Sequence, residues 1–191
     1  MKEKLFVIAD ISGSMADSGK THITRNLCNY ITQLHSLDSR RFQNVEFLFH
    51  KWNSAIEQVS LTEKEGFPLL PAEKSAELEV LSAFLNERLT ETLPLRVLIL
   101  SDGNYAYIEL AEFVKMWSGN DQVQIRTVAV GADSDLDKLK RISMGYKVYL
   151  AENISAAIQS VLQTTGSTIK RPMTLDDLSI SENAEVEEEW E

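Results

Sequence analysis

The sequence predicts an α/β fold with a doubly wound, mainly parallel six-stranded sheet, one antiparallel edge strand and helices on both faces. Short apolar runs alternate along the chain with segments in which apolar residues recur every three or four positions. The run LRVLIL at 95–100 is apolar at nearly every position, as expected of a central strand covered on both sides. Together these two patterns favour a parallel sheet with helical crossovers.

Six short apolar runs predict the strands. They are expected at residues 5–9, 45–52, 55–61, 95–100, 123–130 and 147–151. Only Asn53 and Ser54 separate the second run from the third, so these two runs are close enough for a hairpin. One of the two is therefore expected to be the antiparallel edge strand.

Helical periodicity fills the segments between these runs. Helices are expected at residues 20–37, 78–89, 108–117, 136–142 and 154–163. In the first helix, one apolar stripe is formed by Ile23, Leu27, Tyr30, Ile31, Leu34 and Leu37. In the third, the spacing predicts a buried face made of Ile108, Ala111, Val114 and Trp117.

Length and charge predict one domain with an appendage. The chain has 191 residues, of which 43% are hydrophobic and 25% charged, typical of one soluble domain, here placed at 1–165. Residues 167–191 hold eight acidic and two basic side chains, so this segment carries −6 of the net charge of −10. Such acidity argues against nucleic acid or an anionic membrane as the main partner. The acidic tail at 166–191 is expected to be flexible or to bind a partner.

Cysteine content and the first residues bear on the compartment. Cys28 is the only cysteine, which excludes an internal disulfide and fits a reducing environment. The opening MKEKLFVIAD contains too short an apolar run for a signal peptide or a membrane span. A cytoplasmic location is expected.

Oxygen-bearing side chains follow two of the predicted strands. DISGS at 10–14 follows the first strand, and SDG at 101–103 follows the central one. Doubly wound sheets bind ligands beyond the carboxyl ends of their strands, so the two loops face each other if the strands are neighbours. Carboxylate and hydroxyl oxygens are ligands that suit a hard dication such as Mg²⁺.

The charge of this set predicts binding without catalysis. Asp10 and Asp102 bring two negative charges and the serines none, so one coordination position could accept an outside carboxylate. No side chain beside the set is evident as a base that would activate water. The protein is therefore expected not to be an enzyme, and no catalytic residue is assigned.

DISGS, followed by Met15, resembles the D-x-S-x-S motif of von Willebrand factor A (vWA) domains, and SDG resembles that family's second metal loop. The resemblance covers about residues 4–165. It implies a vWA, Rossmann-like fold with a metal-ion-dependent adhesion site (MIDAS), where Ser12 and Ser14 bind the ion directly. Asp10 and Asp102 would bind it largely through water, and an acidic residue of a partner would complete the shell. Mg²⁺ is the expected ion, with Mn²⁺ or Ca²⁺ as alternatives.

One position departs from the family pattern. The family usually supplies a threonine from the loop before the second helix, and here that loop reads PLLPAEKSAEL at 68–78. Ser75 is the nearest hydroxyl and is taken as a candidate metal ligand. It is equally well placed to be the N-cap of the following helix.

The resemblance also implies partners. The chain is most similar to bacterial vWA proteins of tellurite-resistance and kinase/phosphatase-associated operons. It would then be an intracellular interaction module in a signalling or stress-response system. A kinase, a phosphatase or an AAA+ ATPase would be the partner that offers an Asp or Glu.

A nucleotide site is the alternative. SMADSGKT at 14–21 ends like a P-loop, and RVLILSD resembles the strand and the acidic residue of a Walker B element. In this interpretation Gly19, Lys20 and Thr21 would bind phosphates and Asp102 would act with the metal. The motif lacks its first glycine, where Ser14 stands, and Asp17 would repel phosphates. If the adhesion site is the correct interpretation, Lys20→Ala should have little effect.

Overall fold

The fold is that of a computed structural model, which describes residues 2–61, 66–89 and 94–163. The expected domain at 1–165 holds all of these residues. The predicted acidic tail at 166–191 lies outside them, so neither its flexibility nor its role in binding is tested.

The six strands form a single sheet in the order β3-β2-β1-β4-β5-β6. They are β1 (Glu3–Asp10), β2 (Val45–Trp52), β3 (Ile56–Gln58), β4 (Leu95–Ser101), β5 (Val123–Ala129) and β6 (Val148–Leu150). All neighbouring strands run parallel except β2 and β3, which are antiparallel. The predicted sheet is confirmed, with β3 as its antiparallel edge, although β3 is shorter than the expected 55–61.

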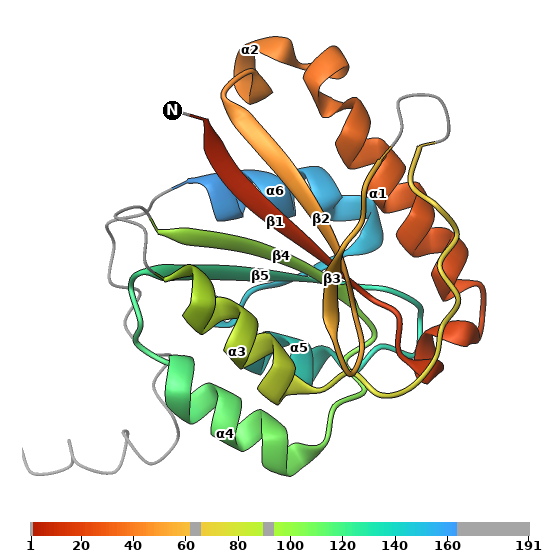
Figure 1. The fold of residues 1–191 in the computed structure, drawn as a ribbon, viewed down its shortest axis with the longest axis vertical. Helices are drawn as coiled ribbons and strands as arrows, with labels where there is room; N and C mark the ends of the chain where they lie inside the picture. The colour runs from red at the N-terminus through yellow and green to blue at the C-terminus, as the bar shows by residue number, and fades with distance from the viewer. Residues whose placement is uncertain (1, 62–65, 90–93, 164–191) are drawn as a thin grey trace, which may run out of the picture.

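Helices connect the parallel strands and lie on both faces of the sheet (Figure 1). They are α1 (Lys20–Leu37), α2 (Ser39–Phe42), α3 (Leu78–Arg88), α4 (Tyr107–Trp117), α5 (Leu136–Ile142) and α6 (Ile154–Leu162). The short α2 was not predicted, and it begins where the Asp38 side chain accepts from the Arg41 backbone N–H. None of the helices in the described segments has the length and apolar character needed to cross a membrane.

The central strand β1 contributes side chains to two separate cores. Leu5, Val7 and Ala9 pack in the core formed with α1 and α6. Phe6 and Ile8 pack in the opposite core, formed with α3, α4 and α5. This alternation is the period of two of a strand covered on both faces, and it holds the carboxyl end of β1 rigidly in place.

The predicted buried face of α4 is right at Trp117, which is buried, and at Val114, which packs against the core, and it is wrong at Ile108 and Ala111. Ile108 is 76% exposed and Ala111 is also exposed, whereas Leu110, Phe113 and Trp117 are buried. Leu110 and Phe113 share helical spacing with Trp117, and together they offer more apolar side chain to the core than Ile108 and Ala111 would. The pattern contained two possible stripes, and only packing distinguishes between them.

Candidate metal centre

The two predicted metal loops follow neighbouring strands. β1 pairs in parallel with β4, with Ala9 opposite Leu100, so Asp10 and Asp102 leave the sheet at the same edge. The connection from β1 leads to β2 on one side, whereas β4 lies on the other, which makes this edge a topological switch point. The fold therefore places the DISGS and SDG loops side by side.

Asp10 is almost fully buried at this edge, with 1% of its surface exposed. Its Oδ1 accepts a hydrogen bond of 2.8 Å from the Ser12 backbone N–H, and its Oδ2 accepts one of 2.5 Å from the Ser101 hydroxyl. Burial raises the pKa of Asp10 to about 6, although both hydrogen bonds favour the ionised form. The carboxylate is thus fixed in orientation and carries a charge that a bound cation would stabilise.

Ser101 positions Asp10, a role that the sequence analysis did not assign to it. Its hydroxyl accepts hydrogen bonds from the Tyr105 hydroxyl at 2.7 Å and from the Gly103 N–H at 3.0 Å while donating to Asp10. All four residues of this network are buried. The only sequence signal was the serine that directly precedes Asp102.

Ser12 and Ser14 have the separation expected of two neighbouring metal ligands. Their Oγ atoms lie 3.2 Å apart. In an octahedral Mg²⁺ shell with bonds of about 2.1 Å, adjacent ligand oxygens are about 3 Å apart. Ser14 lies in the turn Gly13–Ala16, and Ser12 directly precedes it. The fully buried Met15 anchors this turn. These residues therefore fit the ion that the sequence resemblance implies.

Asp102 is also buried, with 4% exposed, and both of its carboxylate oxygens have partners. Oδ1 accepts from the Asn104 N–H at 3.1 Å, and Oδ2 accepts from the Lys20 ammonium at 2.9 Å. Each oxygen retains a second lone pair that could accept from a metal-bound water. The lysine contact, like the role of Ser101, is a feature of this site that the sequence did not predict.

Lys20 brings three loops together. Its side chain is only 2% exposed, and its Nζ also donates to Asp133 Oδ2 at 2.7 Å and to the Ser14 carbonyl at 3.2 Å. Burial by itself would lower the pKa of Lys20, but the hydrogen bonds and charges of Asp133 and Asp102 outweigh it, so the pKa lies above its ordinary value. The ammonium is therefore a permanent positive charge at the site.

Gly131 leaves the space through which the Lys20 side chain passes. Its φ is +98°, and a Cβ at this position would lie 2.8 Å from Lys20 Cε and 2.9 Å from Asp133 Oδ1. Both the backbone conformation and the close approach require glycine. The glycine, the lysine and the aspartate thus form one arrangement, although they come from two distant parts of the chain.

The segment that carries Ser75 lies against the DISGS loop. The Gly13 N–H donates to the Lys74 carbonyl at 2.8 Å, and the Glu73 N–H donates to the Ile11 carbonyl at 2.8 Å. Ser75 is exposed, and it is not the N-cap of α3, because that helix begins at Leu78 with Glu77 at the cap position. The alternative role as a helix cap is therefore wrong.

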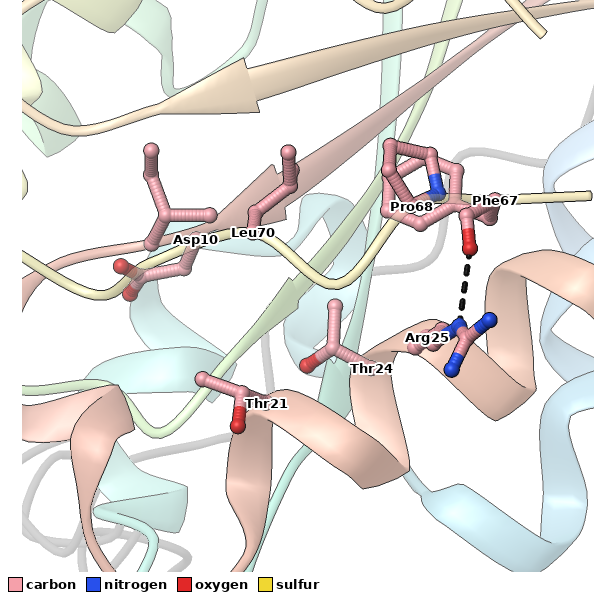
Figure 2. A pocket seen from close by; sticks show the side chains of 8 residues that line it. Asp10, Thr21, Thr24, Arg25, Phe67, Pro68 and Leu70 are labelled. Carbon is pink, nitrogen blue, oxygen red and sulfur yellow. Dashed lines mark hydrogen bonds between the residues drawn. The ribbon is translucent and has the colours of Figure 1, made fainter. Parts of the chain in front are cut away.

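A small pocket, lined in part by Asp10, lies between α1 and the segment at 67–70 (Figure 2). Arg25 closes one end by donating from Nε to the Phe67 carbonyl at 3.0 Å. Thr24 lines this pocket, and its hydroxyl is the one buried side-chain oxygen or nitrogen without a hydrogen-bond partner in the described segments. Apart from Asp10, no lining residue is acidic, so this pocket adds no further carboxylate to the site.

The P-loop alternative does not fit this geometry. Lys20 directs its ammonium at Asp102 and Asp133, so a phosphate would have to displace two carboxylates. The residues from 13 to 16 form a closed turn on the buried Met15, and their backbone is not the open anion-binding loop of a P-loop.

A metal here would not be held by a cluster of strong ligands. Across the three described stretches of chain, no group of three or more His, Cys, Asp or Glu side chains is arranged to hold an ion. The donors that the fold brings to this edge are the carboxylates of Asp10 and Asp102 and the hydroxyls of Ser12 and Ser14. Hard oxygen donors of low total charge suit Mg²⁺ or Mn²⁺ held partly through water.

Solved structures of other proteins share this fold. A vWA paralog of ArnB, named VWA2, from Sulfolobus acidocaldarius has a TM-score of 0.56 at 15% identity over 83% of this chain and 45% of that one. Proximal thread matrix protein 1 from the mussel byssus, with a zinc-occupied MIDAS motif, has a TM-score of 0.57 at 12% identity over 86% and 48%. The manganese-loaded TRAP protein of Plasmodium vivax has a TM-score of 0.53 at 15% identity over 82% and 72%.

These similarities show a vWA-like, Rossmann-like α/β fold. The chain spans less than half the length of the archaeal and mussel proteins. No protein-family model and no curated protein matches the sequence. None of the three similar structures is described as a tellurite-resistance protein.

Proposed function

We propose that this chain is a protein-interaction module that binds a divalent cation, Mg²⁺ or Mn²⁺, and uses it to recognise an Asp or Glu of a partner protein. The observation that carries the proposal is the meeting of DISGS and SDG at the edge between β1 and β4, with the Ser12 and Ser14 hydroxyls 3.2 Å apart. The zinc and manganese found in two proteins of the same fold support a divalent ion.

The roles of the residues follow from their chemistry. Ser12 and Ser14 would hold the ion directly, and Ser75, exposed beside them, is the candidate for a third hydroxyl. Asp10 and Asp102 would supply charge through bound water. Bound there, the ion supplies a Lewis-acidic position that attracts a carboxylate. The chain's own residues orient that position and, in this proposal, perform no reaction.

The finer proposals concern the setting. A kinase, a phosphatase or an AAA+ ATPase in a bacterial signalling or stress system remains the proposed partner class, and the cytoplasm the proposed location. Cys28 is fully buried and burial raises the pKa of its thiol, so this side chain is inert and does not bear on the location.

A titration with Mn²⁺ tests the site. We expect the wild type to bind one Mn²⁺ and Asp10→Ala to lose binding while the fold is retained. Asp137→Ala removes one surface charge, at a side chain 91% exposed, and should leave binding unchanged. Water-proton relaxation then reports the waters on the bound ion, and added acetate should displace at least one. A wild type that binds no Mn²⁺ contradicts the proposal.

A further inference from the structure

The described residues hold a cation of their own at this edge of the sheet. Lys20 Nζ lies within 3.2 Å of three oxygens: Asp133 Oδ2, Asp102 Oδ2 and the Ser14 carbonyl. Two of these groups belong to the proposed metal site itself. Asp102 is a proposed ligand, and the Ser14 hydroxyl would bind the ion, whereas the Ser14 carbonyl accepts from the lysine.

Lys20 is too buried and too well bound to be an ordinary surface lysine. It is 2% exposed and begins α1 after Gly19, whose φ of +72° turns the chain into the helix. Its two ion pairs join positions that are 82 and 113 residues away in the sequence. The fold thus brings the loops after β1, β4 and β5 together around a single positive charge.

We propose that Lys20 is a built-in counter-cation that competes with the divalent ion for Asp102 and sets the metal affinity of this site. The proposal rests on the metal-dependent function proposed above. In the metal-free protein, the ammonium stabilises the buried Asp102. With an ion bound, the ammonium would repel the ion and would compete with it for the Asp102 carboxylate. The ion would therefore be held weakly enough to exchange readily.

Charge determines the direction of the effect. Asp10, Asp102 and Asp133 bring three negative charges, and Lys20 offsets one of them. A unit charge and a dication about 6 Å apart repel each other by enough to change a binding constant about tenfold even in bulk water. Removal of the ammonium should therefore strengthen the binding of a divalent ion.

The same argument couples the ion to folding. Without Lys20, the metal-free protein holds Asp102 buried and without its cation, which destabilises the fold. A divalent ion can then take the place of the missing charge. The stability of Lys20→Gln should depend on metal far more than the stability of the wild type does.

The experiment uses the full chain and Mn²⁺ in low-salt buffer. The variants are Lys20→Gln, the double variant Lys20→Gln/Asp102→Asn, and Lys140→Gln as a matched control. Lys140 forms a surface ion pair with Asp137, so its loss changes the net charge equally without touching the site. Calorimetry gives the Mn²⁺ dissociation constant, and thermal unfolding in EDTA and in saturating Mn²⁺ gives the midpoints.

We expect Lys20→Gln to bind Mn²⁺ about tenfold or more tightly than the wild type, to unfold at a lower temperature in EDTA and to gain more from Mn²⁺. In EDTA, the double variant should unfold at a higher temperature than Lys20→Gln, near the midpoint of the wild type. Its midpoint should change little when Mn²⁺ is added. Lys140→Gln should behave as the wild type in both measurements.

The contrary results separate this inference from the proposed function. If the wild type binds Mn²⁺ and Lys20→Gln binds it no more tightly, the inference fails and the metal site stands. If Lys20→Gln stays unfolded even in Mn²⁺, the inference also fails, because the ion then does not replace the ammonium. If neither protein binds Mn²⁺, both the inference and the proposed function fail.

Discussion

The Ser101 hydroxyl donates a hydrogen bond of 2.5 Å to Asp10 Oδ2 across 91 residues of sequence. This contact links the carboxyl ends of β4 and β1 and fixes the carboxylate on which the proposed metal site depends. Because Ser101 also accepts from the Tyr105 hydroxyl, the orientation of Asp10 is coupled to a buried network. The effects of mutations in this network should therefore be measurable as stability.

The first prediction concerns this network. Ser101→Ala removes the hydrogen bond that the Tyr105 hydroxyl donates and the one that Asp10 Oδ2 accepts, so we expect the free energy of unfolding to fall by about 2–4 kcal/mol. Thr24→Val is the matched comparison, since the Thr24 hydroxyl is buried without a partner, and its loss should be neutral or stabilising. Urea unfolding measures both; equal losses in the two variants would contradict the account of the network.

The second prediction is a pH dependence of the metal-free protein. Burial raises the pKa of Asp10 from 3.8 to about 6, so the native state binds this proton more tightly than the unfolded state does. The contribution of Asp10 to stability is therefore present below pH 4 and is lost as the pH rises to about 6. The loss at pH 7 should be about 3 kcal/mol.

Asp10→Asn isolates this contribution, because other titrating groups affect both proteins alike. The difference in unfolding free energy between Asp10→Asn and the wild type, in EDTA, should grow in favour of the variant between pH 4 and 7. Curves that stay parallel over this range would show that Asp10 does not titrate as described.

The third prediction concerns Gly131. Gly131→Ala adds a Cβ at a φ of +98° that meets Lys20 Cε at 2.8 Å, so we expect a loss of about 2–4 kcal/mol and altered Mn²⁺ affinity. Gly119→Ala is the control, because its φ of +84° carries similar strain and no atom lies within 4 Å of the added group. It should cost about 1 kcal/mol. A similar loss of stability in both variants would show that backbone strain alone accounts for the effect and that the close approach to Lys20 adds nothing.

The fourth prediction orders the hydroxyl ligands. Ser12→Ala and Ser14→Ala should each weaken Mn²⁺ binding by tenfold or more, and Ser75→Ala by less, because Ser75 is exposed at the rim. Ser75→Thr keeps the hydroxyl and should bind as the wild type does. Calorimetry measures the series; a Ser75→Ala variant of unchanged affinity would remove Ser75 from the ligand set.

The fifth prediction separates metal from nucleotide. Because Lys20 is held by Asp102 and Asp133, ATP in the presence of Mg²⁺ should shift the thermal midpoint no more than Mg²⁺ alone does. A further shift with ATP, lost in Lys20→Ala, would restore the P-loop alternative.

The sequence predicted those parts of the fold that depend on local pattern. The six strands and the five longer helices follow from periodicity, whereas the meeting of the DISGS and SDG loops was expected only if β1 and β4 are neighbours, as the sheet order now shows. The buried face of α4 was predicted correctly at Val114 and Trp117 but not in its first turn, because Ile108 and Leu110 start two stripes of similar spacing. Only the packed core decides which stripe is buried.

The site was predicted less completely, for a physical reason. Asp10, Ser12, Ser14 and Asp102 stand in short motifs, so the chain itself marks them. Lys20 and Asp133 meet through tertiary structure alone, 113 residues apart, and no local pattern reports such a contact. Lysine next to glycine at 19–20 pointed instead to phosphate, and the true partners of the ammonium are carboxylates.

The interior position of β1 has a consequence for how a bound ion or partner would leave the proposed site. Its amides are hydrogen-bonded to β2 on one side and to β4 on the other, so they should exchange with deuterium only when the whole molecule unfolds. Asp10 ends this strand and cannot fray away from it. An ion or a partner would then leave through changes in the exposed loops around the site alone. The centre of the sheet would not have to open.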